Sequence, residues 1–410
     1  MILCGLSGYA QNNNTSSPYS RFGLGDLNHY GYGRSSAMGG ATLGSRHSSQ
    51  MNSANPASYT SNDSLSFIFN FGIDGTFSKY KSNSGNRKTN DVNFRYFSLT
   101  WPVTKWLGAG MGLQPFSDMG YEVGFIDSLS GIDNAQTYSG NGTTSKAFFG
   151  VAITPVKGLS IGANMNYIFG KLSKNTTMEF ADPTVFSTLK TENTRLRDFT
   201  LTYGLQYDLK LKENKYLTLG ITFEKKSDFT ILYQSLTYTG VGQTISNKVD
   251  STYEVEAKRI LKMPSTFGIG LSYNHVNKLE INADYYHAAW SKELFPGKVD
   301  ELITDQNRFS AGFEYIPDAT SIRSYFKRVR YRAGAHHEKS YLMFNDNPIK
   351  EIGISFGVGL PFPKSKSTAN LAFELGKKGT MDDNLVKNNY TKFSLYLNIH
   401  DYWFMKRKFD

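Results

Sequence analysis

Two neighbouring histidines, His336 and His337, are the side chains best suited to metal chemistry, since imidazole is a common zinc ligand. They lie in a stretch where residue types alternate, which is typical of a strand. Successive side chains of a strand point to opposite faces, so these two rings cannot bind one ion together. The single cysteine, Cys4, lies at the extreme N-terminus and adds no ligand. We therefore expect neither a metal site nor a cofactor.

Signatures of catalysis are also missing. The sequence has no Ser-His-Asp signature and no phosphate-binding glycine loop followed by lysine. A weak nucleophile needs an adjacent base or a depressed pKa to act, and no motif supplies that arrangement. We expect a protein that is not an enzyme.

Asn55, Pro56 and Ala57 form a short motif at the end of a segment rich in Gly, Ser and Asn. Pro56 restricts Asn55 to extended backbone conformations. The Asn55 side chain can bond to nearby backbone and fix a turn. The motif therefore predicts a structural turn between this segment and the next part of the chain, and a ligand-binding role is the less favoured reading.

Pro115 lies within Leu113–Tyr121, an otherwise strand-like stretch. Proline has no N–H to give to a β-ladder, so it is normally confined to edges and bulges. We expect a kink in this strand at Pro115. The alternative is that Pro115 lies where the ladder is already loosening, above a membrane.

From about residue 64 onward, apolar and polar residues alternate with a period of two, the pattern of strands with one apolar face. Ile352, Ile354 and Phe356, for example, alternate with Gly353 and Ser355. The alternating runs predict fourteen strands, which start near residues 64, 92, 106, 143, 159, 194, 216, 265, 279, 307, 328, 350, 367 and 390. No segment shows an apolar stripe of helical period or an apolar run of the ~18 residues that a membrane helix needs.

The connections decide between a soluble sandwich and a membrane barrel. Short turns near 102–105, 154–158, 212–215 and 275–278 are separated by long polar stretches near 79–91, 120–142, 172–194, 225–263, 292–306, 338–349 and 377–389. Outer-membrane barrels combine short periplasmic turns, long extracellular loops and an even strand number. The sequence predicts an all-β fold, a fourteen-stranded antiparallel transmembrane barrel, with both termini on the periplasmic side. Within 225–263 we expect a hairpin that projects beyond the membrane.

The chain divides into four parts. Residues 1–10 are typical of the end of a secretory signal, with a cleavage position after Ala10, and a lipid anchor on Cys4 is the less favoured reading. Residues 11–62 lack strand alternation, residues 63–405 form the barrel, and residues 406–410 form a basic periplasmic tail. Taken alone, residues 11–62 could also be a disordered tail.

The small-residue run after Ala37, followed by Asn55-Pro56-Ala57 before the first strand, resembles the FadL/TodX outer-membrane transporters of hydrophobic compounds. The run Met263-Pro264 at the start of a central strand is also similar to that family. The resemblance implies that residues 11–62 form a plug, or hatch, inside the barrel. It also implies that a kinked third strand opens a gap in the wall through which substrate leaves sideways into the membrane.

The function that this resemblance implies is passive uptake of hydrophobic or amphipathic small molecules, such as fatty-acid-like or aromatic compounds. The apolar side chains of the plug and of the region around Pro115 are the candidate pathway: Met38, Leu43, Met51, Phe116, Met119 and Tyr121. The opening Ser-Arg-Phe-Gly-Leu-Gly run is similar to Bacteroidota members. The alternative is a non-transporting barrel subunit of a larger outer-membrane complex, such as a type IX secretion or barrel-assembly machinery.

The net charge of +10 bears on the partners. The sequence has no basic stripe with interleaved aromatic residues, so it does not indicate a nucleic-acid partner. Anionic lipopolysaccharide and outer-membrane lipid suit the expected location, although ordinary solvated charge also accounts for the excess. Five basic residues gather near the longest of the periplasmic turns: Arg323, Lys327, Arg328, Arg330 and Arg332. They could bind a carboxylate headgroup, but salt bridges to the plug are the favoured reading.

Overall fold

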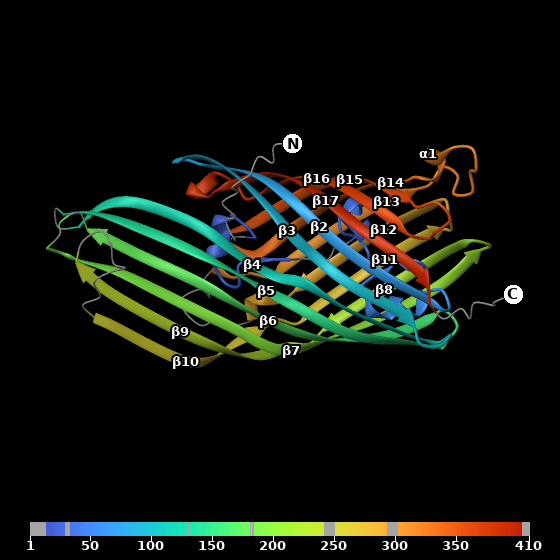
Figure 1. The fold of residues 1–410 in the computed structure, drawn as a ribbon, viewed down its shortest axis with the longest axis horizontal. Coiled ribbons are helices and arrows are strands. Elements are labelled where there is room, and N and C mark those ends of the chain that lie inside the picture. The colour runs from blue at the N-terminus through green and yellow to red at the C-terminus, as the bar shows by residue number, and fades with distance from the viewer. Residues whose placement is uncertain are drawn as a thin grey trace, which may run out of the picture.

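The computed structural model describes residues 14–28, 33–129, 132–180, 182, 184–241, 251–292 and 302–403. Beyond a short N-terminal stretch, most of this chain forms one antiparallel sheet that closes on itself (Figure 1). Its strands are β2 (Ser66–Ser82), β3 (Gly85–Pro102), β4 (Leu107–Leu129), β5 (Ile132–Val156), β6 (Leu159–Phe180), β7 (Phe186–Lys212), β8 (Lys215–Glu224), β9 (Ser227–Val241), β10 (Ser251–Met263), β11 (Thr266–His275), β12 (Leu279–Ala288), β13 (Gln306–Tyr315), β14 (Arg330–Phe344), β15 (Asn347–Pro361), β16 (Thr368–Lys378) and β17 (Lys387–Tyr402). The signal-like residues 1–10, residues 11–13 and the basic tail 406–410 lie outside the described residues.

These strands, β2 to β17, form the fourteen spans of the wall, because β8 and β9 lie along one span and β10 and β11 along the next. Pro264 separates β10 from β11, as expected of a residue without an N–H for the ladder. Pairing of β17 with β2, from Lys387↔Lys81 to Tyr402↔Ser66, closes the cylinder. The predicted fourteen-stranded antiparallel barrel is confirmed.

The wall is apolar on its outside and polar on its inside. In β15, Ile352, Ile354 and Phe356 are 54%, 50% and 49% exposed, whereas Ser355 is fully buried. Buried polar side chains of the other strands include Asn70, Thr100, Asn164, Thr202, Gln206, Thr222, Ser272, Asn282, Asn370 and Asn398. An outer surface of large apolar residues around a polar interior is the pattern of a barrel that faces lipid.

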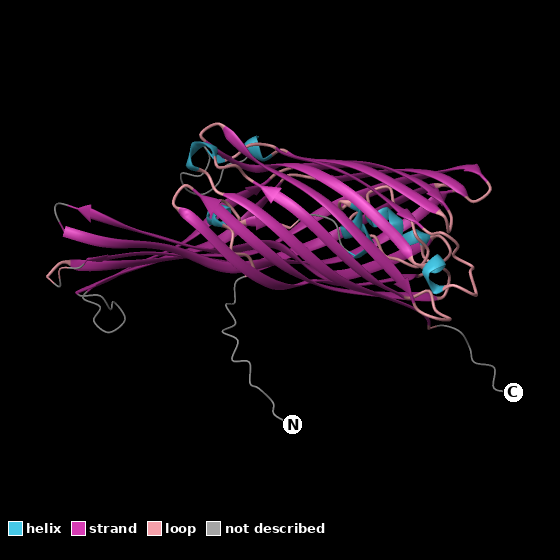
Figure 2. Cartoon of the chain, turned by 90° about the horizontal axis from the view of Figure 1, so that it is seen from above, coloured by secondary structure: helices cyan, strands magenta, loops and turns pink. Residues whose placement is uncertain are grey.

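The two ends of the barrel differ. At the short-turn end, tight connections such as 157–158, 213–214 and 276–278 join the strands, and β2 begins and β17 ends there. At the hairpin end, a group of strands continues past the rest of the wall (Figure 2), and Figure 1 identifies them as β4 to β7, β9 and β10. These strands reach 27 residues, whereas a tilted strand crosses a bilayer in about 10 residues.

The prediction of long loops near 79–91, 120–142, 172–194 and 338–349 was wrong, because most of these residues lie in strands that pair with each other. They are rich in Thr, Tyr, Ser and Asn on both faces, and β-branched and aromatic residues favour strands even without an apolar face. The expected hairpin within 225–263 is confirmed by the pairing of β9 with β10. Residues 293–301 of the expected loop 292–306 lie outside the described residues.

The N-terminal residues 14–28 and 33–62, here called the inner segment, lie within the barrel (Figure 1). They contain three short 3-10 helices and one short strand: η1 (Pro18–Arg21), β1 (Asp26–Leu27), η2 (Gly33–Met38) and η3 (Pro56–Ser61). η2 contacts β13 to β17, and η3 contacts β3 to β7, so the segment touches most of the wall. It runs toward the short-turn end, where it joins β2.

Helical turns also occur in three connections: α1 (Tyr325–Arg328) between β13 and β14, η4 (Trp290–Lys292) after β12, and η6 (Asp382–Asn384) before β17. Among the described residues, no helix is long and apolar enough to span a membrane.

Inserting a charge on the lipid-facing side tests the orientation of the wall. We expect Ile354→Arg, in the middle of β15, to lower the free energy of unfolding in phospholipid vesicles by roughly 2–4 kcal/mol, because the arginine would lie in hydrocarbon. Urea-induced unfolding measures the effect, with Ile354→Leu as the control. Equal unfolding midpoints for the two variants would contradict the assigned orientation.

Candidate functional site

The ladder between β3 and β4 is incomplete. The two strands pair only from Pro102↔Gly108 to Phe97↔Leu113. Beyond this point β3 continues along β2, and β4 continues along β5. Pro115 lies two residues past the last pair, beside a β-bulge at Phe116 where the β4–β5 register shifts. A residue without an N–H, next to a bulge that re-aims the strand, suits a place where two strands part.

The inner segment fills this gap and binds to β4 as an additional strand. β1 pairs antiparallel with β4 through Asp26↔Asp118 and Leu27↔Ser117. The backbone N–H of Asn28 donates to the carbonyl oxygen of Phe116 at 2.9 Å, and its side-chain amide donates to Asp118 at 2.7 Å. The unpaired edge of β4 therefore receives backbone partners from the N-terminal part of the chain.

The same segment binds to β3 on the opposite side of the gap. The side-chain amide of Asn93 donates to the carbonyl oxygen of Asn14 at 2.7 Å, and the Ser16 hydroxyl donates to Asp91 at 3.0 Å. Asn14 also reaches across to β4, where its side-chain amide donates to Asp118 at 3.1 Å. Residues 14–28 thus bridge the strands that have separated.

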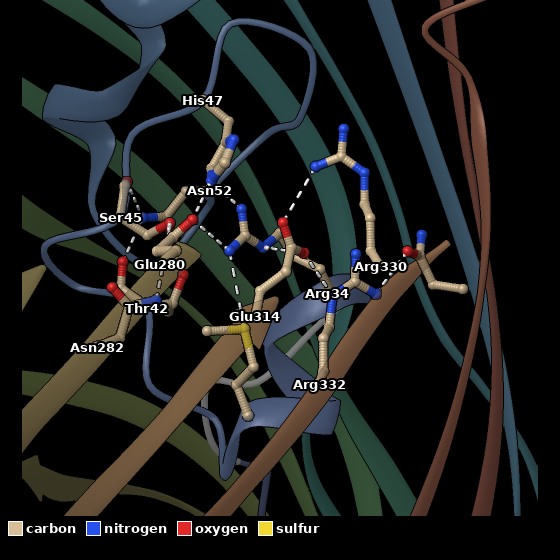
Figure 3. Close-up of polar contacts among 12 residues, drawn as sticks. Arg34, Thr42, Ser45, His47, Asn52, Glu280, Asn282, Glu314, Arg330 and Arg332 are labelled. Atoms are coloured by element: carbon tan, nitrogen blue, oxygen red, sulfur yellow. Dashed lines mark hydrogen bonds and ion pairs between the residues drawn. The ribbon is translucent and has the colours of Figure 1, made fainter. Parts of the chain in front are cut away.

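Deeper in the barrel, a buried ion-pair network holds the inner segment to β12, β13 and β14 (Figure 3). Nη2 of Arg34 lies 2.6 Å from Oε2 of Glu280, and Nε of Arg34 lies 3.9 Å from Oε2 of Glu314. Glu314 also pairs with Arg332 at 2.7 Å and with Arg330 at 3.0 Å. Two residues of the predicted basic cluster therefore share a carboxylate with the inner segment.

Further buried acceptors fix the chain that follows Arg34. Oδ2 of Asp284 accepts hydrogen bonds from the backbone N–H groups of Thr42 and Leu43 at 2.5 and 2.8 Å. Ser45 donates to Oε1 of Glu280 at 2.8 Å. Hydrogen bonds to charged groups contribute about 1.5–3 kcal/mol each, so these contacts resist withdrawal of the segment.

Inward-facing glycines of the wall form seats for the inner segment. Gly312 and Gly334 are paired across β13 and β14, and a Cβ on either would lie within 2.6 Å of Met38 atoms. Gly220 and Gly270 form a matching pair under Leu43. Backbone can approach this closely only where the wall has no side chain. The small inward residues therefore allow the lumen to be filled.

The Asn55-Pro56-Ala57 motif lies in the same interior. Asn55 caps η3 by accepting from the N–H of Ala57 at 3.1 Å, and its amide donates to the carbonyl oxygens of Leu43 at 3.0 Å and Leu205 at 3.2 Å. All three motif residues are buried. The side chain ties the turn both to the preceding chain and to β7.

The candidate pathway residues fall into separate groups. Met119 and Tyr121 are part of an apolar cluster near the hairpin end, with Phe116 packed against it. Met38 and Leu43 lie on the glycine seats, and Met51 packs against Tyr59 near the short-turn end. The structure therefore does not bring the six side chains together into one lining.

Two cavities lie beside the gap. One of about 60 Å³ has a mixed lining, in which Phe116, Ile168 and Met263 lie beside the charged side chains of Lys146 and Glu224. The other, of about 210 Å³, is polar. Its lining carries seven acidic side chains, Asp26, Asp74, Asp91, Asp118, Glu338, Glu351 and Glu374, and the basic side chains Arg95, Arg308, Lys378 and Lys392. The larger space is therefore acidic and would favour cations over apolar molecules.

The polar contacts of the inner segment depend on four residues that were not predicted as site residues: Arg34, Glu280, Asp284 and Asp118. Their signal was present, because a charged residue at an inward position of an alternating strand needs a buried partner. What the sequence lacked was the identity of that partner, which lies up to 246 positions away.

The closed fourteen-stranded barrel with an N-terminal segment in its lumen is a fold shared with solved structures of FadL and TodX type. Solved structures with this fold include the CymD monoaromatic hydrocarbon channel (15% identity, TM-score 0.59, 94% of this chain and 100% of that one) and the Pseudomonas putida toluene transporter TodX (17%, 0.58, 92% and 99%). A Pseudomonas aeruginosa FadL homologue is also similar (11%, 0.57, 92% and 99%). A search of the curated proteins found no match.

The chain belongs to the BamG family, whose model matches residues 1–410. The predicted likeness to FadL and TodX therefore holds for the fold, whereas the family itself is a different one. The Bacteroidota origin stays a prediction.

Removing one charge from the network tests how firmly the inner segment is held. We expect Glu280→Gln to lower the free energy of unfolding by about 3–5 kcal/mol, because Arg34 would remain buried without its carboxylate. Hydrogen exchange of residues 33–47 and denaturant unfolding in detergent micelles measure the change. Glu213→Gln, in an exposed turn, is the matched control. If both variants behave alike, the network does not hold the segment.

Proposed function

We propose that this protein is a closed barrel subunit of a larger outer-membrane assembly. The observation that carries the proposal is that the inner segment both bridges the β3–β4 gap and fills the lumen through buried ion pairs. Of the two assemblies considered from the sequence, membership in the BamG family favours the barrel-assembly machinery. In this proposal, outer-membrane lipid and lipopolysaccharide surround the wall, the short-turn end faces the periplasm, and both termini are periplasmic.

The sizes of the cavities favour a closed barrel over a conduit. An apolar cavity of about 150 Å³ can hold benzene. The smaller cavity beside the gap is about 60 Å³, which is too small for an aromatic hydrocarbon or an acyl chain. The 210 Å³ cavity is large enough, but an apolar molecule gains nothing by entering a space lined with carboxylates.

The hairpin end offers a surface for a protein partner. β4 to β7 are 22 to 27 residues long and extend beyond the span of a bilayer. Near their tips, Ile126 is 83% exposed and Phe186 is 54% exposed. Large apolar side chains on a projecting, otherwise polar surface are typical of contact sites.

A second candidate is passage of hydrophobic or amphipathic small molecules sideways through the wall. The parting of β3 and β4 next to Pro115 favours it, and proteins of this fold include a monoaromatic hydrocarbon channel and a toluene transporter. This function requires residues 14–28 to leave the gap and to break the polar contacts that they make there.

A disulfide that locks β1 to β4 separates the two candidates. Leu27 and Ser117 are direct partners, at a spacing that a disulfide can bridge, so Leu27→Cys/Ser117→Cys in a Cys4→Ser background would hold the gap shut. We expect the locked barrel to enter the same complex as the unlocked one on native gels, with unchanged uptake of labelled toluene or oleate. Uptake that falls on locking and returns on reduction would establish the conduit instead.

Substitution at the hairpin end tests the subunit directly. We expect Ile126→Asp to dissociate the native complex in mild detergent, because it puts a charge into an apolar contact. Val156→Asp, which changes an exposed apolar residue at the opposite end of β5, is the matched control and should leave the complex intact. A chain that migrates as a monomer before any substitution would contradict the proposal.

A further inference from the structure

We propose that the acidic cavity holds a divalent transition-metal ion, bound by His336, Glu351 and Glu374. These residues come from three neighbouring strands, β14, β15 and β16, and none of them contacts the inner segment through the network described above. One ligand atom from each lies within 4.8 Å of the others. All three line the 210 Å³ cavity.

Paired glycines make room for this group of side chains. Across four strands, His336 pairs with Gly353, Gly353 with Gly376, and Gly376 with Tyr390. A Cβ on Gly353 would lie 2.3 Å from Cε1 of His336, and a Cβ on Gly376 would lie 2.2 Å from Cζ of Tyr390. Each ring therefore lies across the glycine of the neighbouring strand. Side chains at 353 and 376 would push both rings away from the carboxylates.

The two carboxylates of this group share a single hydrogen-bond donor, so one of them lacks a proton or a positive charge beside it. The Tyr390 hydroxyl lies 2.6 Å from Oε1 of Glu351 and 2.8 Å from Oε1 of Glu374. A phenol has one proton to donate, so it can satisfy only one of two ionised carboxylates. A cation between the carboxylates would remove this conflict.

His336 points to the same conclusion independently. Its side chain is only 2% exposed, and neither ring nitrogen makes a hydrogen bond. Nε2 lies 3.5 Å from Oε1 of Glu351, so the ring faces the carboxylates. A buried imidazole with two free nitrogens is costly unless a proton or a metal ion binds it.

Three of the four basic side chains that line the cavity, Arg95, Arg308 and Lys378, form ion pairs with other carboxylates. Nζ of Lys378 lies 2.8 Å from Asp26, and Nη1 of Arg308 lies 2.7 Å from Glu338. Among the described residues, Glu374 has no ion pair, and Glu351 has only His336. Lys392, the fourth, is the cross-strand partner of Glu374, but among the described residues it forms no ion pair, so both carboxylates keep an oxygen for an ion from solution.

One imidazole nitrogen with carboxylate oxygens suits zinc, and also manganese or ferrous iron, better than calcium or magnesium. Ligand atoms about 2.1 Å from a tetrahedral zinc are roughly 3.4 Å apart, so modest rotation of Glu374 would complete the site. The bound ion would connect β14, β15 and β16 from inside the barrel. The expected absence of a metal site considered only His336 with His337, and His337 indeed lies exposed on the outer face.

Titration of the intact, untagged barrel with zinc chloride tests the proposal. After removal of metal with a chelator, we expect one saturable zinc per chain by calorimetry in detergent micelles. His336→Gln should weaken binding at least tenfold, since it removes the only nitrogen ligand. His337→Gln, the adjacent side chain on the outer face, is the matched control and should change binding less than twofold.

If His336→Gln fails to fold, Glu374→Gln provides a second variant. We expect it also to weaken zinc binding at least tenfold. Cobalt substitution adds a spectrum that reports the coordination number. Absence of saturable zinc binding in the unsubstituted barrel would overturn the proposal. Equal affinity of the His336→Gln or Glu374→Gln variant and the His337→Gln control would also overturn it.

Discussion

Within a membrane, every backbone N–H and C=O of the wall needs a partner from the protein, because hydrocarbon offers none. The fourteen spans meet this requirement by closing into a cylinder, with β17 paired to β2. Within the described part of the wall, β3 and β4 are neighbouring spans that part early, beyond Leu113. There the inner segment adds β1 as a short strand on β4. The N-terminal residues therefore complete the wall and also occupy the lumen.

The same requirement explains the composition of the interior. Glycine pairs such as Gly312 with Gly334 let the inner segment approach the strands. Buried carboxylates bind its donors: Glu280 binds the charged Arg34, and Asp284 accepts from two backbone N–H groups. A buried charge is tolerated only with a partner in good geometry. Lumen and inner segment thus depend on one another. This mutual dependence favours a closed subunit over an open conduit.

Much of the fold could be predicted from local pattern, and the site could not. The period-two alternation marks each wall strand by itself, so the strand count of fourteen followed from short stretches such as Ile352–Phe356. The hairpin extensions were mistaken for loops because both of their faces are polar. The contacts of Arg34 with Glu280 join residues 246 positions apart, and no local pattern specifies such a partner. Pro115 was the exception, since a missing N–H is a local property.

The central claim is that the inner segment closes the barrel, and electrical conductance tests it most directly. A single barrel in a planar lipid bilayer should show no conductance steps in its native form. Deleting residues 14–28 should produce clear steps, because the β3–β4 gap and the space beside it would open to water. Conductance steps from the undisturbed chain, equal to those of the deletion, would contradict the account.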